Sequence, residues 1–563
     1  MLKKPIVLIV CICFLAGTGF AQNTNQIAVT SAHHLATDAA VEILRSGGNA
    51  ADAAFTTAAV LSVVQPWFSS VMGGGTWGLY YQASSGRIRA LDGVGTAASG
   101  ATPEFFSNSN NASSSGMHQA IVPGAWAGWM EWLKAYGKKP LDELLQPAID
   151  IAEDGYVVYR EMAEWLQRGE DNIRRWPYSR EIYVRNGRLL GRGDTVRQPQ
   201  MADTFRRMQQ VYRQNLRRGH KAALNAANDY FYRGPIAEGI VEYSKAHGGL
   251  FELSDFTEFR TGLVDPLSID YRGIEVYQNP PNSQGITMLI ALNILEGYDF
   301  SDLSVNSPEA VHLQVEALKV AHAAKHRHVG DPAFIDVPVH TLLSEGFSRA
   351  ARDLISTDNV LTWPFPRIID ELERSNTTTY SIIDQEGNGA AITTSLGAQF
   401  LVAGPSGVHI NNRMRMFNYS RGLPNTVQPG KKVRHTSNPY IALRNGRLYM
   451  LGGNTGVDTQ PQGQVQQFIN VVEFGLTAQE AVSHPRFVTR AFPAGQWPFR
   501  ADNDLGLEAS TPRNLRNSLA RMGHNIASNG IWGDAQMIVI DPATGRMETG
   551  TDPRGGVGKG VVE

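Results

Sequence analysis

The chain has 563 residues, with 51 Lys and Arg against 53 Asp and Glu, and 42% of its residues are hydrophobic. Normal apolar content and a net charge near zero exclude intrinsic disorder. They also argue against a nucleic-acid partner, because neutralising phosphates requires a concentrated basic face. The length allows a large core and more than one lobe.

The first 21 residues have the pattern of an export signal. Lys3 and Lys4 precede an apolar run over 6–16, and Gly19-Phe20-Ala21 offers a small-x-small cleavage site. The run is shorter than the roughly 20 apolar residues that span a bilayer, so we expect no stable membrane insertion. Residues 1–21 are predicted to be removed as a signal peptide, leaving a periplasmic or secreted protein. Both cysteines, at 11 and 13, lie in this segment, which excludes thiol catalysis and disulfides from the mature chain.

Helical patterns dominate the first part of the mature chain. Apolar residues recur at helical spacing over 34–46, where Gly47-Gly48 ends the helix, and Asn49 caps a second helix that runs to Val64. The elements expected next, in chain order, are a strand at 77–81, a strand ending at Leu91, helices within 121–156 with one at 141–153, a strand at 274–277 and a helix at 307–328.

Strand patterns dominate after Ser375. Residues 378–383 alternate, 384–388 form a turn, and 390–395 return, which predicts a β-hairpin. Few long helical patterns follow. An α-rich part thus precedes a β-rich part, which predicts the α+β class.

Three other patterns favour ordinary structural roles. The Arg-rich segment 160–221 contains aromatic residues but also acidic ones, so a solvated face is favoured over a nucleic-acid patch. His322 and His326 have the spacing of zinc ligands, but without a third ligand solvated or hydrogen-bonded histidines are favoured. Gly73 to Gly78 has the letters of a dinucleotide fingerprint but precedes a strand, so close packing is favoured. No metal or other cofactor is predicted.

The candidate nucleophile lies at the border between the two parts. The sequence has no Gly-x-Ser-x-Gly elbow and no P-loop, but it has Asn376-Thr377-Thr378-Thr379-Tyr380-Ser381. A threonine hydroxyl needs a base beside it, and an N-terminal threonine carries one in its free α-amine. The alternative is that three threonines only open a β-strand, for which they have good propensity.

The same segment carries a resemblance to a known family. Together with Gly47-Gly48-Asn49-Ala50-Ala51-Asp52, Pro280-Pro281-Asn282-Ser283-Gln284-Gly285 and Asp552-Pro553-Arg554, it resembles the γ-glutamyltransferase family along nearly the whole mature chain. The resemblance implies an N-terminal-nucleophile hydrolase with an αββα sandwich and autocleavage between Asn376 and Thr377. The expected products are a large α-rich subunit, 22–376, and a small β-rich subunit, 377–563, that stay together as a heterodimer.

The resemblance also implies roles for individual residues. Thr377 is the expected nucleophile, with its freed α-amine as general base, and Ser395 is expected to hydrogen-bond it. The backbone N–H groups of Gly456 and Val457 correspond to the family's oxyanion-binding pair. The expected substrate-binding residues are Asn412, Arg413, His435 and Thr436.

The substrate pocket departs from the family pattern. Val94 stands where the family has an Arg for the α-carboxylate, and Met416 stands where it has an acidic residue for the α-amine. Gly397 and Arg413 replace amide-bearing residues. Each lost charge-assisted contact weakens a γ-glutamyl head by about 1.5–3 kcal/mol. Basic residues at 413, 415 and 434 favour a donor with an anionic group and no nearby amine.

The expected function is therefore cleavage or transfer of an acyl group from a small-molecule amide, such as a γ-glutamyl compound. Two alternatives stay open. One is an acylase of the same family for a different amide, and the other is an inactive member that binds a ligand. An intact Thr377 favours an enzyme, since a pure binder would not need a threonine there.

Overall fold

The computed structural model describes residues 26–361, 377–528 and 532–563. The predicted signal peptide and Asn376 lie outside these ranges. Within them, no helix combines the length and the apolarity needed to cross a membrane.

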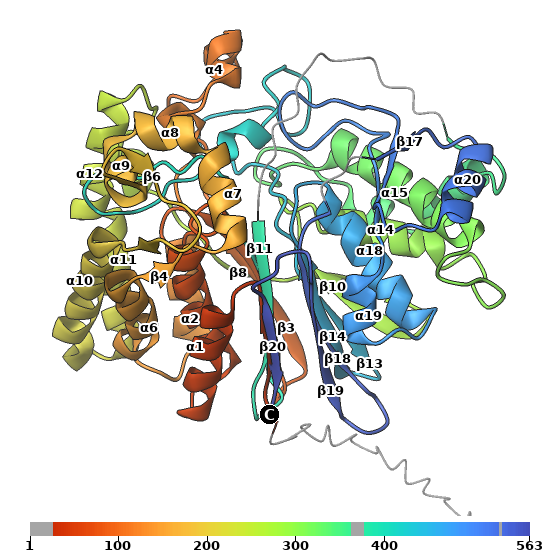
Figure 1. Ribbon diagram of the computed structural model, residues 1–563, viewed down its shortest axis with the longest axis horizontal. Coiled ribbons are helices and arrows are strands. Elements are labelled where there is room, and N and C mark those ends of the chain that lie inside the picture. The colour runs from red at the N-terminus through yellow and green to blue at the C-terminus, as the bar shows by residue number, and fades with distance from the viewer. Residues whose placement is uncertain (1–25, 362–376, 529–531) are drawn as a thin grey trace, which may run out of the picture.

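Two antiparallel sheets form the middle of the molecule, and helices cover their outer faces (Figure 1). The seven-stranded sheet has the order β20 (Lys559–Val562), β1 (Ala28–Ser31), β11 (Thr377–Ile383), β12 (Gly389–Ser395), β2 (Gly75–Gln82), β3 (Arg87–Gly93), β8 (Gly262–Val264). The six-stranded sheet has the order β19 (Met547–Thr551), β18 (Ala535–Ile540), β14 (Arg447–Asn454), β13 (Tyr440–Arg444), β10 (Ile274–Gln278), β9 (Leu267–Tyr271). The predicted αββα sandwich is confirmed.

The helix layer on the seven-stranded sheet comes from the first part of the chain. Its helices are α1 (His34–Arg45), α2 (Ala50–Val64), α5 (Ala125–Tyr136), α6 (Leu141–Asp154), α10 (Pro199–Asn215), α11 (His220–Tyr232) and α12 (Pro235–Ala246). The start of α2 follows the sequence signal, because Asn49 and Asp52 form a reciprocal capping box. All fifteen residues of α2 are buried, so it packs on every side.

The second helix layer mixes segments from both parts of the chain. It contains α14 (Ile286–Leu295), α15 (Pro308–His328), α17 (Glu345–Leu354), α18 (Thr459–Val472), α19 (Ala478–Ser483) and α20 (Arg513–Arg521). The helix predicted at 307–328 is confirmed, with Ser307 as its cap. The helix α18 was not among the elements predicted from the sequence. Nearly all its residues are buried, including glutamines, so it lacks the polar face that marks an amphipathic helix.

Shorter elements complete the described chain. They are α3 (Pro103–Phe106), α4 (Ser109–Ser113), α7 (Arg160–Arg168), α8 (Glu170–Arg175), α9 (Pro177–Tyr183), α13 (Leu253–Thr257), α16 (Val339–Leu342), β4 (Tyr156–Val157), β5 (Val184–Arg185), β6 (Arg188–Leu189), β7 (Thr195–Val196), β15 (Phe487–Thr489), β16 (Leu505–Leu507) and β17 (Ile526–Ala527).

Apolar side chains fill the space between the two sheets and the space under each helix layer. Between the sheets lie Leu79, Ile383, Ile441, Leu451 and Ile538, all essentially inaccessible to solvent. Because alternate residues of a strand face opposite sides, each central strand contributes to two of these cores. This packing holds the central strands rigidly.

The α-rich and β-rich parts do not form separate lobes. In the seven-stranded sheet, β11 and β12 lie between β1 and β2, and β20 closes the edge beside β1. The six-stranded sheet likewise joins β9 and β10 to later strands. Segments from both sides of Thr377 therefore share each sheet and each core.

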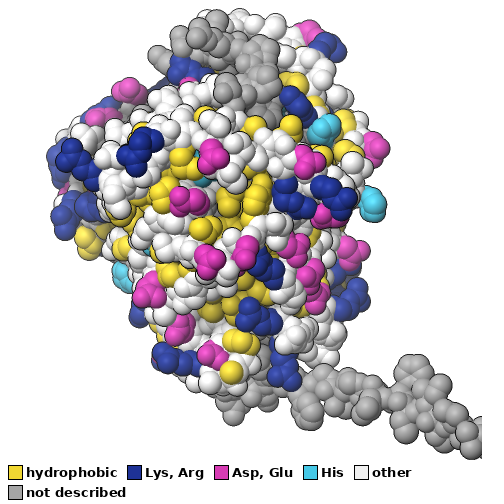
Figure 2. All heavy atoms as spheres, turned by 90° about the vertical axis from the view of Figure 1, so that its right-hand side faces the viewer, with side chains coloured by type: hydrophobic (Ala, Val, Ile, Leu, Met, Phe, Trp, Pro, Cys, Tyr) yellow, Lys and Arg dark blue, Asp and Glu magenta, His cyan; other side chains and the backbone are white. Residues whose placement is uncertain are grey.

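The charged surface agrees with the favoured interpretation of segment 160–221. Its arginines pair with nearby acids, as in Arg160 with Glu164 and Arg174 with Glu170. The face formed by the second helix layer also carries both signs of charge interspersed (Figure 2).

Candidate active site

The first residue of β11, Thr377, lies at one end of an interior strand of the seven-stranded sheet. Thr377 is paired in register with Ser395, the last residue of β12, and Ser395 is paired with Gly75 of β2. The Thr377 Oγ1 and Ser395 Oγ atoms are hydrogen-bonded at 3.0 Å, and both residues are buried. The close-packing role expected for the glycine run is confirmed, because a Cβ at Gly73 would overlap the His409 carbonyl.

A second side chain reaches Thr377 from the first turn of α18. Gln460 Nε2 donates to Thr377 Oγ1 at 3.2 Å. Gln460 was not among the site residues predicted from the sequence. The sequence does carry a signal, which is five glutamines within eight residues: Gln460, Gln462, Gln464, Gln466 and Gln467. In the structure all five are buried, although glutamine is usually exposed.

The loop before α18 carries the predicted oxyanion residues. Gly456 has φ +88°, which glycine adopts without strain, and its carbonyl accepts from the Gln460 N–H at 3.0 Å. Within the described chain, the N–H groups of Gly456 and Val457 donate to no acceptor. They sit at the positive end of the α18 dipole. Two free N–H groups therefore lie on the loop whose helix also contacts Thr377.

A buried ion pair is hydrogen-bonded to the segments that flank this loop. Arg486 pairs with Asp552, and Arg486 Nη1 donates to Asn454 Oδ1 at 3.2 Å and to the Gly533 carbonyl at 2.8 Å. The next residues of the two segments are also joined, because the Thr455 N–H donates to the Asp534 carbonyl at 2.7 Å.

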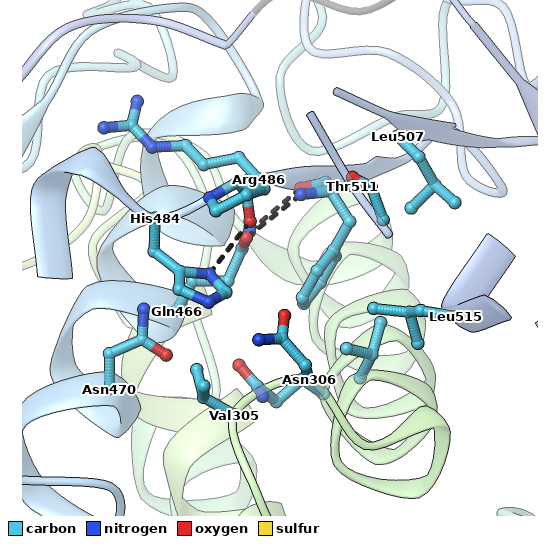
Figure 3. Close-up of a pocket in the computed structure, with 13 residues that line it drawn as sticks. Val305, Asn306, Gln466, Asn470, His484, Arg486, Leu507, Thr511 and Leu515 are labelled. Carbon is cyan, nitrogen blue, oxygen red and sulfur yellow. Dashed lines mark hydrogen bonds between the residues drawn. The ribbon is translucent and has the colours of Figure 1, made fainter. Parts of the chain in front are cut away.

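Arg486 also lines a small pocket in the second helix layer. Figure 3 shows Gln466, Asn470 and His484 around this cavity of about 20 Å³. Gln466 exchanges two hydrogen bonds with the Phe487 backbone. None of the predicted site residues lines this pocket, so it lies apart from Thr377 and its hydrogen-bond partners.

The predicted substrate residue Arg413 lies against the hydrogen-bonded residues Thr377, the predicted nucleophile, and Ser395. These two residues are called the nucleophile pair below. Arg413 Nη1 donates to Ser395 Oγ at 2.7 Å, and its Nη2 donates to Asn412 Oδ1 at 2.9 Å. The side chain is fully buried, and its Nε has no partner in the described chain. Burial, with the Arg415 charge second, lowers the pKa of Arg413 to about 9, so the guanidinium stays cationic at neutral pH.

Met416 lies between Arg413 and Thr436. Its Sδ is 3.9 Å from Arg413 Nη1 and 4.0 Å from Thr436 Oγ1, and its side chain is buried. The position that holds an acid in the family pattern is therefore apolar and next to a cation. Val94 is also fully buried, and its side chain offers no donor for a carboxylate.

His435 is buried beside Gly75, the first residue of β2. Its Nδ1 accepts from the Ser437 N–H at 3.2 Å, and its Nε2 has no partner in the described chain. The Nε2 faces Gly75, where an added Cβ would come within 3.0 Å. Burial, followed by the Arg413 charge, lowers the pKa of His435 well below its usual range. The imidazole is therefore neutral at physiological pH.

The described residues contain one group with metal-ligand chemistry, and it lies in the second helix layer. His312 Nδ1 and His524 Nε2 are 2.8 Å apart, and Glu316 binds the Lys319 ammonium at 2.7 Å. These atoms are thus already occupied by one another and by Lys319. The interpretation of His322 as solvated or hydrogen-bonded is wrong: it is buried, neither of its nitrogens has a partner among the described residues, and its ring stacks on Phe492 at 3.9 Å.

Comparison with known proteins decides the family. The gamma-glutamyltranspeptidase family model matches residues 36–561. The chain belongs to the gamma-glutamyltranspeptidase family. It is an enzyme of the hydrolase and acyltransferase class, with the N-terminal-nucleophile fold that the resemblance implied.

Its relatives carry two kinds of name. The chain is 31% identical over 540 residues to a glutathione hydrolase-like proenzyme, YwrD, of Bacillus subtilis strain 168, covering 94% of this chain and 97% of that protein. It is 30% identical over 539 residues to the acylase ACY 1 proenzyme of Pseudomonas sp. strain SE83, covering 93% and 91%. Among solved structures, a cephalosporin acylase from Bacillus halodurans matches with a TM-score of 0.83 and 30% identity, covering 95% of each chain.

Proposed function

We propose that this family member cuts itself before Thr377 and then uses the new N-terminal threonine to hydrolyse or transfer the acyl group of an amide. The observation that carries the proposal is the contact of the Thr377 hydroxyl with both Ser395 and Gln460, near a loop on which two N–H groups have no acceptor among the described residues. Such a nucleophile needs only an adjacent base and an oxyanion site to act on an amide.

Self-processing uses the same hydroxyl. The Thr377 Oγ1 attacks the carbonyl carbon of Asn376, and the peptide C–N bond breaks as the acyl group moves to oxygen. Water then hydrolyses the ester. The products are residues 22–376, ending in a carboxylate, and residues 377–563, beginning with a free amine.

Turnover repeats this chemistry on a small molecule. The neutral α-amine of Thr377 takes the hydroxyl proton as Oγ1 attacks the donor carbonyl, and the N–H groups of Gly456 and Val457 bind the oxyanion. The leaving amine receives the proton, and water or an acceptor amine releases the acyl group. Ser395 and Gln460 fix the direction of the Thr377 oxygen.

The donor we favour lacks an α-amine. Val94 and Met416 are buried and cannot form the two charged contacts of a zwitterionic γ-glutamyl head. The acylase names among the relatives support an amide donor other than a γ-glutamyl compound. The glutathione hydrolase names favour a γ-glutamyl donor as the second candidate, which needs other side chains to supply the anchors.

Electrophoresis of the purified protein tests the processing step. Wild type should give two chains that correspond to 22–376 and 377–563, whereas Thr377→Ala should stay a single, inactive chain. Thr378→Val is the matched control, because the Thr378 hydroxyl has no partner in the described chain and its loss should leave cleavage intact. Cleavage of Thr377→Ala at the same bond would assign the cut to an outside protease.

A further inference from the structure

We propose that Arg413 and Gly397 together form an anchor for a carboxylate on the acyl part of the donor, placed only a short spacer away from the scissile carbonyl. The inference rests on the proposed function and narrows its substrate to amides of short dicarboxylic acids. It assigns substrate specificity to a side chain that touches the nucleophile pair itself.

The charge on Arg413 has no counter-ion in the described chain. The guanidinium contacts the Ser395 hydroxyl, the Asn412 amide oxygen and the Met416 sulfur, and it forms no ion pair with a described carboxylate. A guanidinium has five N–H donors, and the Nε–H is among those left over. Burying an unpaired charge is costly, so an anion that binds here gains more than one that binds at the surface.

Gly397 provides the space that this guanidinium occupies. Its φ is +97°, and a Cβ at this position would overlap Asn412 Oδ1 and Arg413 Nη2. Any larger residue would therefore push Arg413 away from Ser395. The two departures from the family pattern are thus one coupled change, because the glycine is needed for the arginine to reach the nucleophile pair.

Other buried cations nearby already have partners. Arg434 Nη1 donates to the carbonyls of Lys325 and Val329 at 3.3 Å, at the negative end of α15. The Lys325 ammonium is paired with Asp458. Of the basic residues that the sequence analysis singled out, Arg413 is therefore the one whose contacts place it at the nucleophile.

The geometry limits the length of the donor. The Ser395 hydroxyl contacts Arg413 at 2.7 Å and Thr377 at 3.0 Å, so one hydroxyl group separates cation and nucleophile. A reacting carbonyl carbon sits about 3–3.5 Å from its nucleophile, and a carboxylate oxygen about 2.7–2.9 Å from a guanidinium nitrogen. We therefore expect a spacer of about two carbons or fewer, as in oxalyl, malonyl or succinyl amides.

A ladder of anilide donors tests the inference. The oxalyl, malonyl, succinyl, glutaryl and γ-glutamyl anilides are compared with a neutral donor, the carboxamide analogue of the succinyl compound. For the processed wild type we expect kcat/KM to be highest for a short dicarboxylic donor and about 10–100-fold above that of the neutral analogue. Arg413→Gln should remove this ratio, Arg413→Lys should restore part of it, and the exposed Arg447→Gln is the matched control.

The outcomes separate this inference from the proposed function. If Thr377 does not support processing or cleavage of any anilide, the proposed function fails. If the neutral donor is cleaved as well as the acidic ones, or if glutaryl and γ-glutamyl donors are best, only the carboxylate anchor is overturned. If Arg413→Gln is not processed, the anchor is tested on wild type by inhibition of the cleavage of the neutral donor. We expect succinate to inhibit this cleavage more strongly than succinamide. Equal inhibition by the two compounds would overturn the proposal.

Discussion

The Thr377 hydroxyl, the proposed nucleophile, is hydrogen-bonded to two side chains. Gln460 donates to its oxygen, and Ser395, which accepts from Arg413, is hydrogen-bonded to it. Hydrogen bonds to fixed neighbours hold this oxygen in one orientation, so no further free energy is needed to orient it during the reaction. The register of β11 and β12 sets this arrangement, since a slip of one residue would turn the Ser395 side chain to the opposite face of the sheet.

The pH dependence should report the amine of Thr377. Only the neutral amine accepts a proton, so kcat/KM should rise about tenfold per pH unit until the pH passes the pKa of that amine. The ordinary pKa is about 7.7–8.0, and burial beside the Arg413 cation should lower it. A stopped assay on a neutral donor, between pH 5 and about 9, measures this limb.

The His435→Ala variant is the control for that assignment. Because burial holds the pKa of His435 well below its ordinary range, the residue does not change charge across the limb. The limb should persist in the variant, although substrate affinity changes. Its loss, with processing complete, would make His435 the base.

At the scale of elements, the loop between β14 and α18 depends on charges that lie far from it in sequence. Asp552 neutralises Arg486, which donates to Asn454 and to the Gly533 carbonyl, the residues that precede Thr455 and Asp534 in the chain. Arg554 joins the network through Asp552 and Glu508. The loop with the two free N–H groups is therefore fixed by a buried network, and not by its own sequence alone.

We expect Asp552→Asn to weaken both stability and catalysis. Breaking a buried ion pair by removing one partner costs about 3–5 kcal/mol, because the remaining charge is left uncompensated. The midpoint of denaturant unfolding should fall, and kcat on a neutral donor should fall more than KM rises, since the role proposed for the loop is to bind the developing oxyanion. The exposed Asp353→Asn is the control. An unchanged kcat despite lower stability would show that the network does not position the loop for catalysis.

The sequence predicts elements whose signals are local. The capping residues of α2 and the alternation in β11 and β12 place these elements correctly, because both depend on near neighbours. The resemblance to the family adds the expectation that Thr377 and Ser395 belong to the site. Gln460 and the Arg413–Gly397 pairing depend on contacts between distant segments, and a helix buried on all sides, such as α18, loses the polar face that periodicity detects.

At the scale of the whole molecule, the bond before Thr377 is not a domain boundary. The strand after it, β11, pairs with β1 on one side and with β12 on the other, and β1 also pairs with β20. Cutting this bond frees one end of β11 but leaves both sheets continuous. Processing can therefore expose a nucleophile inside a core that is already folded.

The two processed chains should stay together until the protein unfolds. Separating them would tear β1 from β11 and β20 and expose the cores on both faces of the seven-stranded sheet, and apolar burial is worth about 25 cal/mol per Å². Processed wild type should therefore elute at the native mass of the uncut Thr377→Ala variant while giving two bands on a denaturing gel. In denaturant, loss of this mass and loss of secondary structure should coincide, and a small chain that elutes alone under native conditions would contradict the shared core.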